Sequence, residues 1–482
     1  MSPLDVPRAA ATSRTVVAAI PWRCITARVA ATIDSRRASG VIRAMDRPYS
    51  LLRICPITPY SCVVTRGRGI VTAAEVTRRR RTLMIRTTPF HPRLAELSQT
   101  GLWGHWAGYL SAVRYDFSAK YEYFGVRNAA AFFDASPLYK YWIRGRDAER
   151  YLGGVMARDI RTCRPGRAQY TVWCDDAGYV LEDGVVFRHT ADEFLLTAAE
   201  PNLSYLRSLI GSLQVEITDA SEDYGILAVQ GPRSRAIVEQ LAPEIAALPY
   251  FGFTPAKIAG RPVTISRTGF SGDLGYEILV ESADALDVLD AVMTAGEGHG
   301  LRPFGEQALS MVRIEAGLPL IGVEFSSSRF AYNDEERVTA TELGLGWLLK
   351  NIDDDTRPFI GRRAILRELA EKTSRWSTVG LMLDWRAYND LYVNAGLIPH
   401  MDEIPVPWET MLYDDKGERA GYATSLMYSP QMQRYIAIAR VKPSLAKVGG
   451  VVHVEQTVNH EYLTVPAEIV RLPFFNPERK LA

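Results

Sequence analysis

The stretch SRTGFSGDLGYE at residues 266–277 decides how the chain is interpreted, because three glycines recur at every third position between two β-rich runs. Neither a helix nor an unbroken strand uses glycine at that spacing. Glycine permits positive φ and a close approach of the backbone to another surface. The runs RPVTIS (261–266) and GYEILV (275–280) are typical of strands, so the stretch predicts a turn between two β-strands. An acidic residue, Glu277, lies close to the start of the second strand.

Strands and helices are mixed on both sides of this turn. Strand-like runs lie at 168–174, 179–188 and 193–199, and the run ADALDVLDAVMTA (283–295) has the period of an amphipathic helix. Asp147 is predicted to cap the helix that follows it. The strands are joined by hairpins rather than by regular βαβ units, which favours an α+β fold.

The pattern changes after the run PFIGRRAILREL (358–369). Residues 378–475 are short β-rich runs broken by Gly, Pro, Asp and Asn, with hardly a helical period. This pattern predicts a separate small β-barrel or sandwich. We therefore expect a region of two α+β subdomains at 84–372 and a C-terminal β-barrel domain at 373–482.

Residues 1–83 have a composition of their own, with fifteen arginines, no lysine and four acidic residues, which leaves a charge of +11 against −10 for the rest. An organellar transit segment fits this composition, and an RNA-binding tail fits RRRR at 78–81. The third hypothesis, which we favour, is that translation begins at Met84 and the earlier residues are a non-native or disordered segment. We expect a cytoplasmic protein, or a mitochondrial one if the segment is a transit peptide.

The remaining composition excludes several classes of protein. No run reaches the roughly 18 apolar residues of a membrane span, so no membrane association is expected. The histidines are scattered singly, and Cys163 and Cys174 have no partner at metal-ligand spacing, so no metal site is predicted. A phosphate-binding glycine loop is also missing, and outside the basic segment nothing indicates a nucleic-acid partner.

Six blocks together resemble the aminomethyltransferase family, whose best-known member is the glycine cleavage T-protein. They occur in the family's order and span about 88–475 of the chain. This resemblance implies a three-domain cloverleaf fold with tetrahydrofolate in a central channel. The blocks are YFGVRNAAAFFDASPLYKYWIRGRDA (123–148), AQYTVWCDDAGYVLEDGVVF (168–187), LAVQGPRSRAIVEQL (227–241), SRTGFSGDLGYEILV (266–280), ALSMVRIEAGLPL (308–320) and LGLGWLLK through FIGRRAIL (343–366).

Two carboxylates carry the chemistry that the resemblance implies. The glutamate after the glycine-rich turn, here Glu277, would bind the flat two-donor edge of the pterin through two parallel hydrogen bonds. The family's central aspartate is the second acid of LEDGVV, here Asp183, while Glu182 takes the first position. Because neighbours on a strand point to opposite faces, only one of the two acids can face the channel, and we expect Asp183. Its role would be to stabilise positive charge near the transferred carbon.

The resemblance also assigns six residues to folate binding, with Arg313 expected to act more through structure than through contact. The family's first asparagine after the third strand is Ala199 here. Phe270 and Leu138 stand where the T-protein has a tyrosine and a methionine. The assigned residues are Tyr170, Asn202, Phe270, Leu138, Trp347 and Arg313.

The donor end departs from the T-protein pattern. An Arg-Asp pair that precedes the RIEAG arginine in the family is Leu309 and Ser310 here. The chain is thus expected to transfer an aminomethyl carbon from a carrier-bound donor, as on a lipoyl protein, or to demethylate a small O-, S- or N-methyl compound. Leu309 and Ser310 slightly favour demethylation.

Two further hypotheses remain at the sequence level. A non-catalytic folate-binding factor for iron–sulfur assembly would carry a cysteine motif, which FIGRRAI (359–365) lacks. A transferase module of a flavin-dependent amine oxidase would need a separate flavoprotein partner, since no dinucleotide fingerprint precedes the six blocks.

Overall fold

The computed structural model describes residues 64–66, 69–71 and 85–481. The chain divides into two compact units, Met1–Met84 and Ile85–Ala482. In the first unit the described residues form one antiparallel hairpin, β1 (Val64–Arg66) and β2 (Gly69–Val71). The hypotheses about the basic segment otherwise fall on residues outside the described ranges. The predicted fold and site belong to the second unit.

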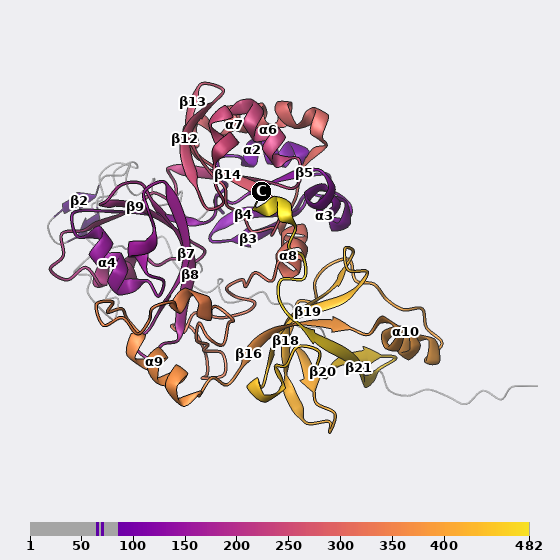
Figure 1. Cartoon of the computed structure of the whole chain (residues 1–482). Helices are drawn as coiled ribbons and strands as arrows, with labels where there is room; N and C mark the ends of the chain where they lie inside the picture. Colours follow the sequence, from indigo (N-terminus) through magenta and orange to yellow (C-terminus); the bar gives the residue numbers. More distant parts are fainter. Residues whose placement is uncertain (1–63, 67–68, 72–84, 482) are drawn as a thin grey trace, which may run out of the picture. The chain divides into compact units, whose positions relative to one another are not determined.

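A six-stranded mixed sheet forms the first part of the second unit (Figure 1). Helices α2 (His91–Leu97), α6 (Ser234–Leu241) and α7 (Ala285–Gly296) pack on one face. Helices α3 (Ala119–Asn128) and α8 (Glu306–Glu315) pack on the other. The strands, in spatial order, are β12 (Phe253–Ile258), β13 (Arg261–Ser266), β14 (Gly275–Glu281), β11 (Tyr224–Gln230), β5 (Ala130–Asp134) and β15 (Leu301–Pro303).

A five-stranded antiparallel sheet forms the second part. Helices α4 (Ala148–Val155) and α5 (Leu203–Ser208) cover one of its faces, so alternate residues of its strands remain for the other face. The strands, in spatial order, are β10 (Glu216–Asp219), β6 (Tyr139–Arg144), β9 (Glu193–Ala198), β8 (Val180–Arg188) and β7 (Arg167–Cys174).

The predicted cap of α4 is wrong in detail. Asp147 does precede the helix, but its side chain accepts a hydrogen bond from the backbone N–H of Gln214 (2.8 Å) and makes no capping bond. The carboxylate therefore holds the loop before β10 against the start of α4. A hydrogen bond to Gln214, which is distant in the sequence, has replaced the expected capping bond to the helix.

A closed six-stranded barrel forms the third part and confirms the prediction of a C-terminal β-barrel. A hairpin, β3 (Leu102–Trp106) and β4 (Tyr109–Arg114), and helix α9 (Arg362–Glu371) lie outside the three sheets. The barrel strands, in spatial order, are β16 (Ser377–Leu383), β19 (Arg434–Val441), β18 (Arg419–Ser429), β17 (Thr410–Tyr413), β20 (Val451–Val458) and β21 (Glu461–Val470).

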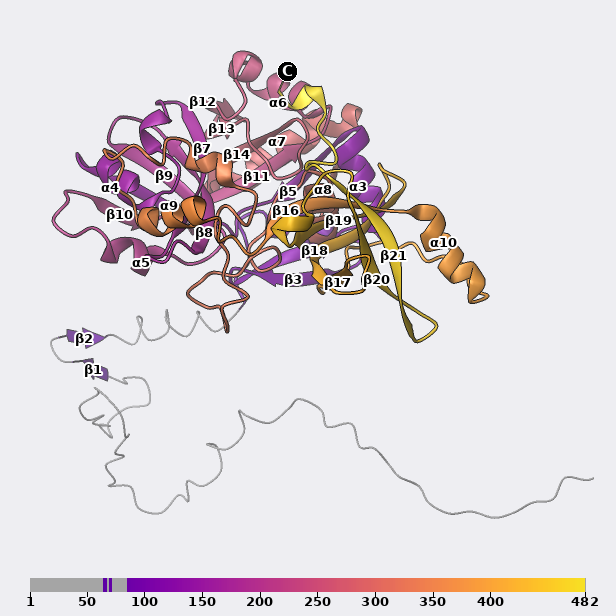
Figure 2. The ribbon, with the colours of Figure 1, turned by 60° about the horizontal axis from the view of Figure 1, so that its bottom comes forward.

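The expectation that the barrel region has hardly any helix is wrong at α10 (Trp385–Asn394), which lies to one side of the barrel in Figure 2. Its residues are poor helix formers, so propensity does not reveal it. Asp384 caps it by accepting hydrogen bonds from the backbone N–H groups of Arg386 (2.9 Å) and Ala387 (3.1 Å). Tyr388 is buried against the barrel. Capping and burial together stabilise the helix.

The glycine-rich turn is a connection between the paired strands β13 and β14, as predicted. What requires Gly269 and Gly275 is the side chain of Gln230, because a Cβ atom at either position would overlap its amide group. That amide donates to the carbonyl of Thr268 (3.3 Å) and accepts from the Ser271 hydroxyl (2.6 Å). The turn therefore closes around one buried glutamine.

The end of the chain returns from the barrel to this turn, beside β14 (Figure 1). Arg479 forms a two-pronged ion pair with Asp273 (2.6 and 2.7 Å), whose side chain is fully buried. Arg127 lies 3.6 Å from the same aspartate and 2.7 Å from Glu315 of α8, and it packs over the ring of Phe475. One buried charge network thus joins the first sheet, α8 and the C-terminal segment.

Gly272→Ala should destabilise the turn more than a matched change elsewhere. Gly272 has φ +72°, and an added Cβ would overlap Ala316, which directly follows α8, whereas Gly260 has φ +76° and open space around it. Gly260→Ala should lower the free energy of unfolding by about 1 kcal/mol through backbone strain alone. Gly272→Ala should lose about 1–3 kcal/mol more from overpacking, measured by denaturant unfolding followed by tryptophan fluorescence. Equal losses would contradict this account.

Candidate active site

A cavity of about 1340 Å³ lies in the second unit, lined by residues of both sheets, the glycine-rich turn, α8, the barrel and the C-terminal segment. Asp183 on β8 and Glu277 on β14 both line it. Two acids from different sheets therefore face one hollow. The volume exceeds the roughly 300–1,000 Å³ typical of small-molecule sites, so an extended ligand or two ligands can be accommodated.

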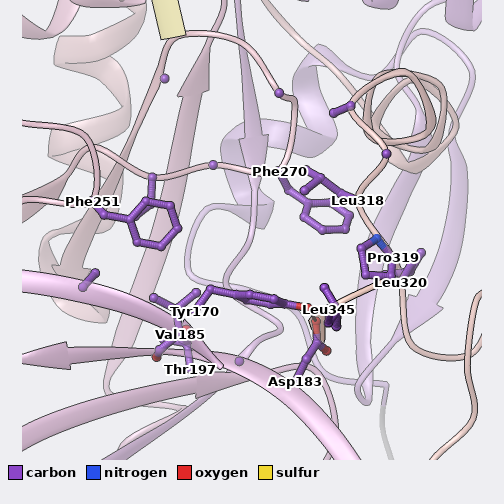
Figure 3. Close-up of a pocket in the computed structure, with 18 of the residues that line it drawn as sticks. Tyr170, Asp183, Val185, Thr197, Phe251, Phe270, Leu318, Pro319, Leu320 and Leu345 are labelled. Atoms are coloured by element: carbon purple, nitrogen blue, oxygen red, sulfur yellow. Dashed lines mark hydrogen bonds between the residues drawn. The ribbon is translucent and has the colours of Figure 1, made fainter. Parts of the chain in front are cut away.

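Asp183 lies on the uncovered face of the second sheet. Tyr170 comes from the neighbouring strand β7, and its hydroxyl donates a hydrogen bond to Asp183 Oδ2 (2.8 Å), as Figure 3 shows. Burial raises the pKa of the Asp183 carboxyl, while the bond from Tyr170 lowers it in part. No arginine or lysine among the described residues forms an ion pair with this aspartate, so its charge is stabilised by a hydroxyl rather than by a cation.

Glu182 points to the opposite face of the strand. It is fully buried, and its Oε2 accepts a hydrogen bond from Asn202 Nδ2 (3.4 Å). Burial, with the charge of Asp183 close by, raises the pKa of this carboxyl. The two neighbouring acids are therefore separated by the sheet, with Asp183 on the cavity side.

Glu277 is held by the turn that precedes it. The Thr268 hydroxyl donates to Glu277 Oε2, and Ser266 in turn lies 2.6 Å from the Thr268 hydroxyl. Burial raises the pKa of Glu277, and the bond from Thr268 opposes the shift. Its Oε1 has no hydrogen-bond partner among the described residues, so one side of the carboxylate remains for a ligand.

Flat and apolar side chains wall the space around these two acids. Figure 3 shows the rings of Phe251 and Phe270 across the open space from Tyr170 and Asp183. Trp347 lines the cavity with 57% of its surface exposed and stacks on Tyr170, with ring centroids 6.3 Å apart. A planar heterocycle with hydrogen-bond donors on one edge matches this combination of aromatic walls and a free carboxylate oxygen.

The predicted site residues therefore divide into two groups. The structure brings Asp183 and Glu277 to one cavity together with Tyr170, Phe270, Leu138 and Trp347.

Asn202 and Arg313 do not line the cavity. Asn202 lies on the helix-covered face of the second sheet, where it contacts Glu182 and the carbonyl of Glu200 (3.0 Å). Arg313 is buried in an ion pair with Glu324 (2.6 Å). Their assignment to folate contact is corrected on this geometry, and the structural role expected of Arg313 fits its ion pair.

Comparison with known proteins bears on this arrangement. The family model described as the GCVT N-terminal domain matches residues 91–351, and the glycine cleavage T-protein C-terminal barrel domain matches residues 395–476. A curated aminomethyltransferase from Streptomyces coelicolor is 32% identical over 379 residues, which cover 77% of this chain and 93% of that protein.

The chain belongs to the glycine cleavage T-protein family.

Two further similar proteins extend the comparison. A trimethylamine-oxide aldolase from Ruegeria pomeroyi is 32% identical over 412 residues, 82% of this chain, and the chain spans about half (48%) of its length. The solved glycine cleavage aminomethyltransferase T from Bartonella henselae matches with a TM-score of 0.68 and 21% identity, over 82% of this chain and 99% of that one. The match to the Bartonella henselae structure confirms the T-protein fold. The matches to the family model and to the curated aminomethyltransferase show that the chain belongs to a family of enzymes.

Three residues of the site were not predicted from the sequence. Thr197 lies on β9 beside β8 and lines the cavity (Figure 3), and the strand alternation could have indicated it. Phe251 lies in the loop between a short 3₁₀ helix (Pro243–Ala247) and β12 and has a positive φ (60°), which no local pattern indicates. Arg158, which also lines the cavity, follows α4 in a segment without a motif.

Other kinds of site are not found in the part of the chain that the structure describes. No group of three or more His, Cys, Asp and Glu residues could hold a metal ion there. Among the same residues, no helix is long and apolar enough to cross a membrane. Cys163 and Cys174 are free and buried.

Asp183→Asn should stabilise the fold at pH 8 but not at pH 4. Folding raises the pKa of Asp183 from 3.8 to about 6, so at pH 4 the carboxyl is protonated in the folded state and only partly ionised in the unfolded state. Its destabilising effect on the folded state develops as the pH rises from 3.8 to about 6 and is fully present at pH 8. Each unit of pKa shift corresponds to about 1.4 kcal/mol. Denaturant unfolding at both pH values measures the difference. Asp176→Asn, in the exposed turn of the same hairpin, is the control. A loss of stability at pH 8 as large as at pH 4 would contradict the assignment.

Proposed function

We propose that this protein is a tetrahydrofolate-dependent one-carbon transferase. The observation that carries the proposal is the placement of two carboxylates, Asp183 and Glu277, on the walls of one cavity between aromatic side chains. Membership of the T-protein family supports it, because relatives in that family are named aminomethyltransferases. Tetrahydrofolate would supply a nucleophilic nitrogen, N5, that accepts a one-carbon unit.

Glu277 would bind the pterin. Its carboxylate keeps one oxygen on Thr268 and offers the other to the cavity, where a pterin presents two N–H donors on one edge. Because the carboxylate is desolvated, hydrogen bonds between it and a ligand are charge-assisted and strong. Phe270 and Gly269, in the turn before it, also line the cavity and would pack on the ligand.

Asp183 would stabilise positive charge at the transferred carbon rather than act as a nucleophile. Positive character develops at the transferred carbon when the one-carbon unit leaves its donor, and a fixed carboxylate in a water-poor cavity stabilises that charge. Tyr170 keeps the Asp183 carboxylate oriented through its hydroxyl. The raised pKa of Asp183 means that its negative charge, and hence the activity, should be lost as the pH falls through that pKa.

The donor end of the cavity has an apolar wall, which favours a small donor. Trp106 lies 6.0 Å from Phe133 between ring centroids, and Phe133 lies 5.3 Å from Phe304. These rings line the cavity together with Leu309, which stands where the family resemblance expects an arginine. We therefore favour demethylation of an O-, S- or N-methyl compound over aminomethyl transfer from a lipoyl carrier protein. A separate flavoprotein that supplies the one-carbon unit is the corresponding partner if the donor is an amine.

Glu277→Gln should weaken tetrahydrofolate binding by about 10- to 100-fold, because the amide keeps the shape of the side chain but loses the charge that strengthens its hydrogen bonds. Isothermal titration calorimetry measures the dissociation constant. Glu281→Gln, at the exposed end of the same strand, is the matched control and should bind as the wild type does. Unchanged affinity in Glu277→Gln would contradict the pterin-binding role.

The reaction itself is tested by the folate product. The protein is incubated with tetrahydrofolate and candidate donors, and the product is identified by mass spectrometry. 5-Methyl-tetrahydrofolate would indicate demethylation, and methylene-tetrahydrofolate would indicate aminomethyl transfer. Asp183→Asn should abolish either product while retaining tetrahydrofolate binding. If the wild type neither binds nor converts tetrahydrofolate, the proposed function is wrong.

A further inference from the structure

The charges around the cavity do not balance. Two of its four acidic lining residues are already neutralised in ion pairs, Asp273 with Arg479 and Glu324 with Arg313. The other two are the proposed functional acids. Against these stand seven basic lining residues: Arg158, Arg164, Arg167, Arg267, Arg440, Arg471 and Lys480. The cavity therefore favours ligands that carry negative charge.

Arg158 is the basic lining residue that contacts the backbone of Tyr170, the residue that holds Asp183. Its backbone N–H donates to Thr171 Oγ1 (3.2 Å), and its guanidinium donates to the carbonyl of Tyr170 (3.2 Å). The guanidinium also lies 5.3 Å from the ring centroid of Trp347. The side chain is half-buried, and burial lowers its pKa. These contacts hold the cation against the wall of the cavity.

The described residues supply no carboxylate to this cation within ion-pair distance. Two fully buried arginines of the same unit, Arg127 and Arg313, each have one, at 2.7 Å from Glu315 and 2.6 Å from Glu324. Burying a charge without a counter-charge is unfavourable, and Arg158, unlike these two arginines, lies beside the cavity without one. A ligand can supply the missing anion.

We propose that Arg158 anchors a subsite that binds a carboxylate of a ligand held in the cavity. A planar guanidinium and a carboxylate match through two parallel hydrogen bonds, and the ring of Trp347 supports the guanidinium from one side. Tyr170 connects this subsite to the proposed reaction centre, because its carbonyl binds Arg158 and its hydroxyl binds Asp183. The proposal rests on the proposed function.

Two ligands could present that carboxylate. One is tetrahydrofolate itself, through its terminal glutamate. The other is the one-carbon donor, if it is an acid. Leu309 on α8 is uncharged, so an acidic donor could not form an ion pair there. It would instead bind Arg158, which contacts Tyr170 of β7.

The test uses the full chain and three variants. Arg158→Gln removes the charge and keeps a polar side chain, and Arg158→Lys keeps the charge but loses the planar fork. Arg161→Gln is the matched control, since Arg161 lies three residues away and is paired with Asp159 (2.9 Å) and Asp354 (3.1 Å) instead of lining the cavity. Equal unfolding midpoints of the variants and the wild type verify that they are folded.

The first arm compares tetrahydrofolate with 6-methyltetrahydropterin, which lacks the benzoylglutamate portion, by isothermal titration calorimetry. If the folate glutamate occupies the subsite, Arg158→Gln should raise the dissociation constant of tetrahydrofolate at least tenfold and leave that of the pterin unchanged. Arg158→Lys should fall between the wild type and Arg158→Gln.

The second arm measures binding, at saturating tetrahydrofolate, of N,N-dimethylglycine, 3-(methylthio)propionate and 3-methoxybenzoate, each against its primary amide. If the donor occupies the subsite, the wild type should prefer at least one acid to its amide about tenfold or more, and Arg158→Gln should lose that preference without a change in tetrahydrofolate affinity.

The subsite is refuted if Arg158→Gln equals the wild type in both arms, or if Arg161→Gln reproduces its effects. A wild-type protein that binds no tetrahydrofolate would instead refute the proposed function, so the two failures are distinguishable.

Discussion

The site depends on two buried carboxylates that the protein leaves without a cation. Asp183 is held by the Tyr170 hydroxyl and Glu277 by the Thr268 hydroxyl, and burial raises the pKa of both acids. A hydroxyl stabilises an ionised carboxylate less than an ion pair does, so both acids retain capacity for a ligand. A constraint elsewhere in the fold must therefore hold the two acids in place.

The buried charge network at Arg127 provides that constraint. It connects α3 through Arg127, α8 through Glu315, the turn through Asp273 and the chain end through Arg479, and Ser429 of the barrel also donates to Glu315 (2.6 Å). Removing one partner would leave an uncompensated buried charge, which is strongly unfavourable. The network therefore fixes the position of the turn relative to the barrel. Because Glu277 follows the turn, its position is fixed as well.

Much of this could be predicted from the sequence, because β-structure has a period of two. That period separates Asp183 from Glu182, and the glycine spacing marks the turn before Glu277. Two predictions failed for different reasons. Asn202 pairs with Glu182 behind the sheet, and Tyr388 of α10 is buried against the barrel, and neither long-range contact leaves a local pattern in a single sequence. The cap of α10 by Asp384, by contrast, is a local signal that the sequence carries.

The two ends of the cavity differ in how freely they can change. Glu277 lies directly opposite Ala228 on β11, and Ala228 lies opposite Phe133 on β5, so strand pairing fixes these side chains on one face. Leu309 and Arg158, by contrast, lie on a helix surface and in a loop, where a substitution disturbs no strand register. Charge can therefore change on α8 or beside β7 without altering the positions of the two acids, so this end of the cavity is less constrained by strand pairing than the end at Glu277.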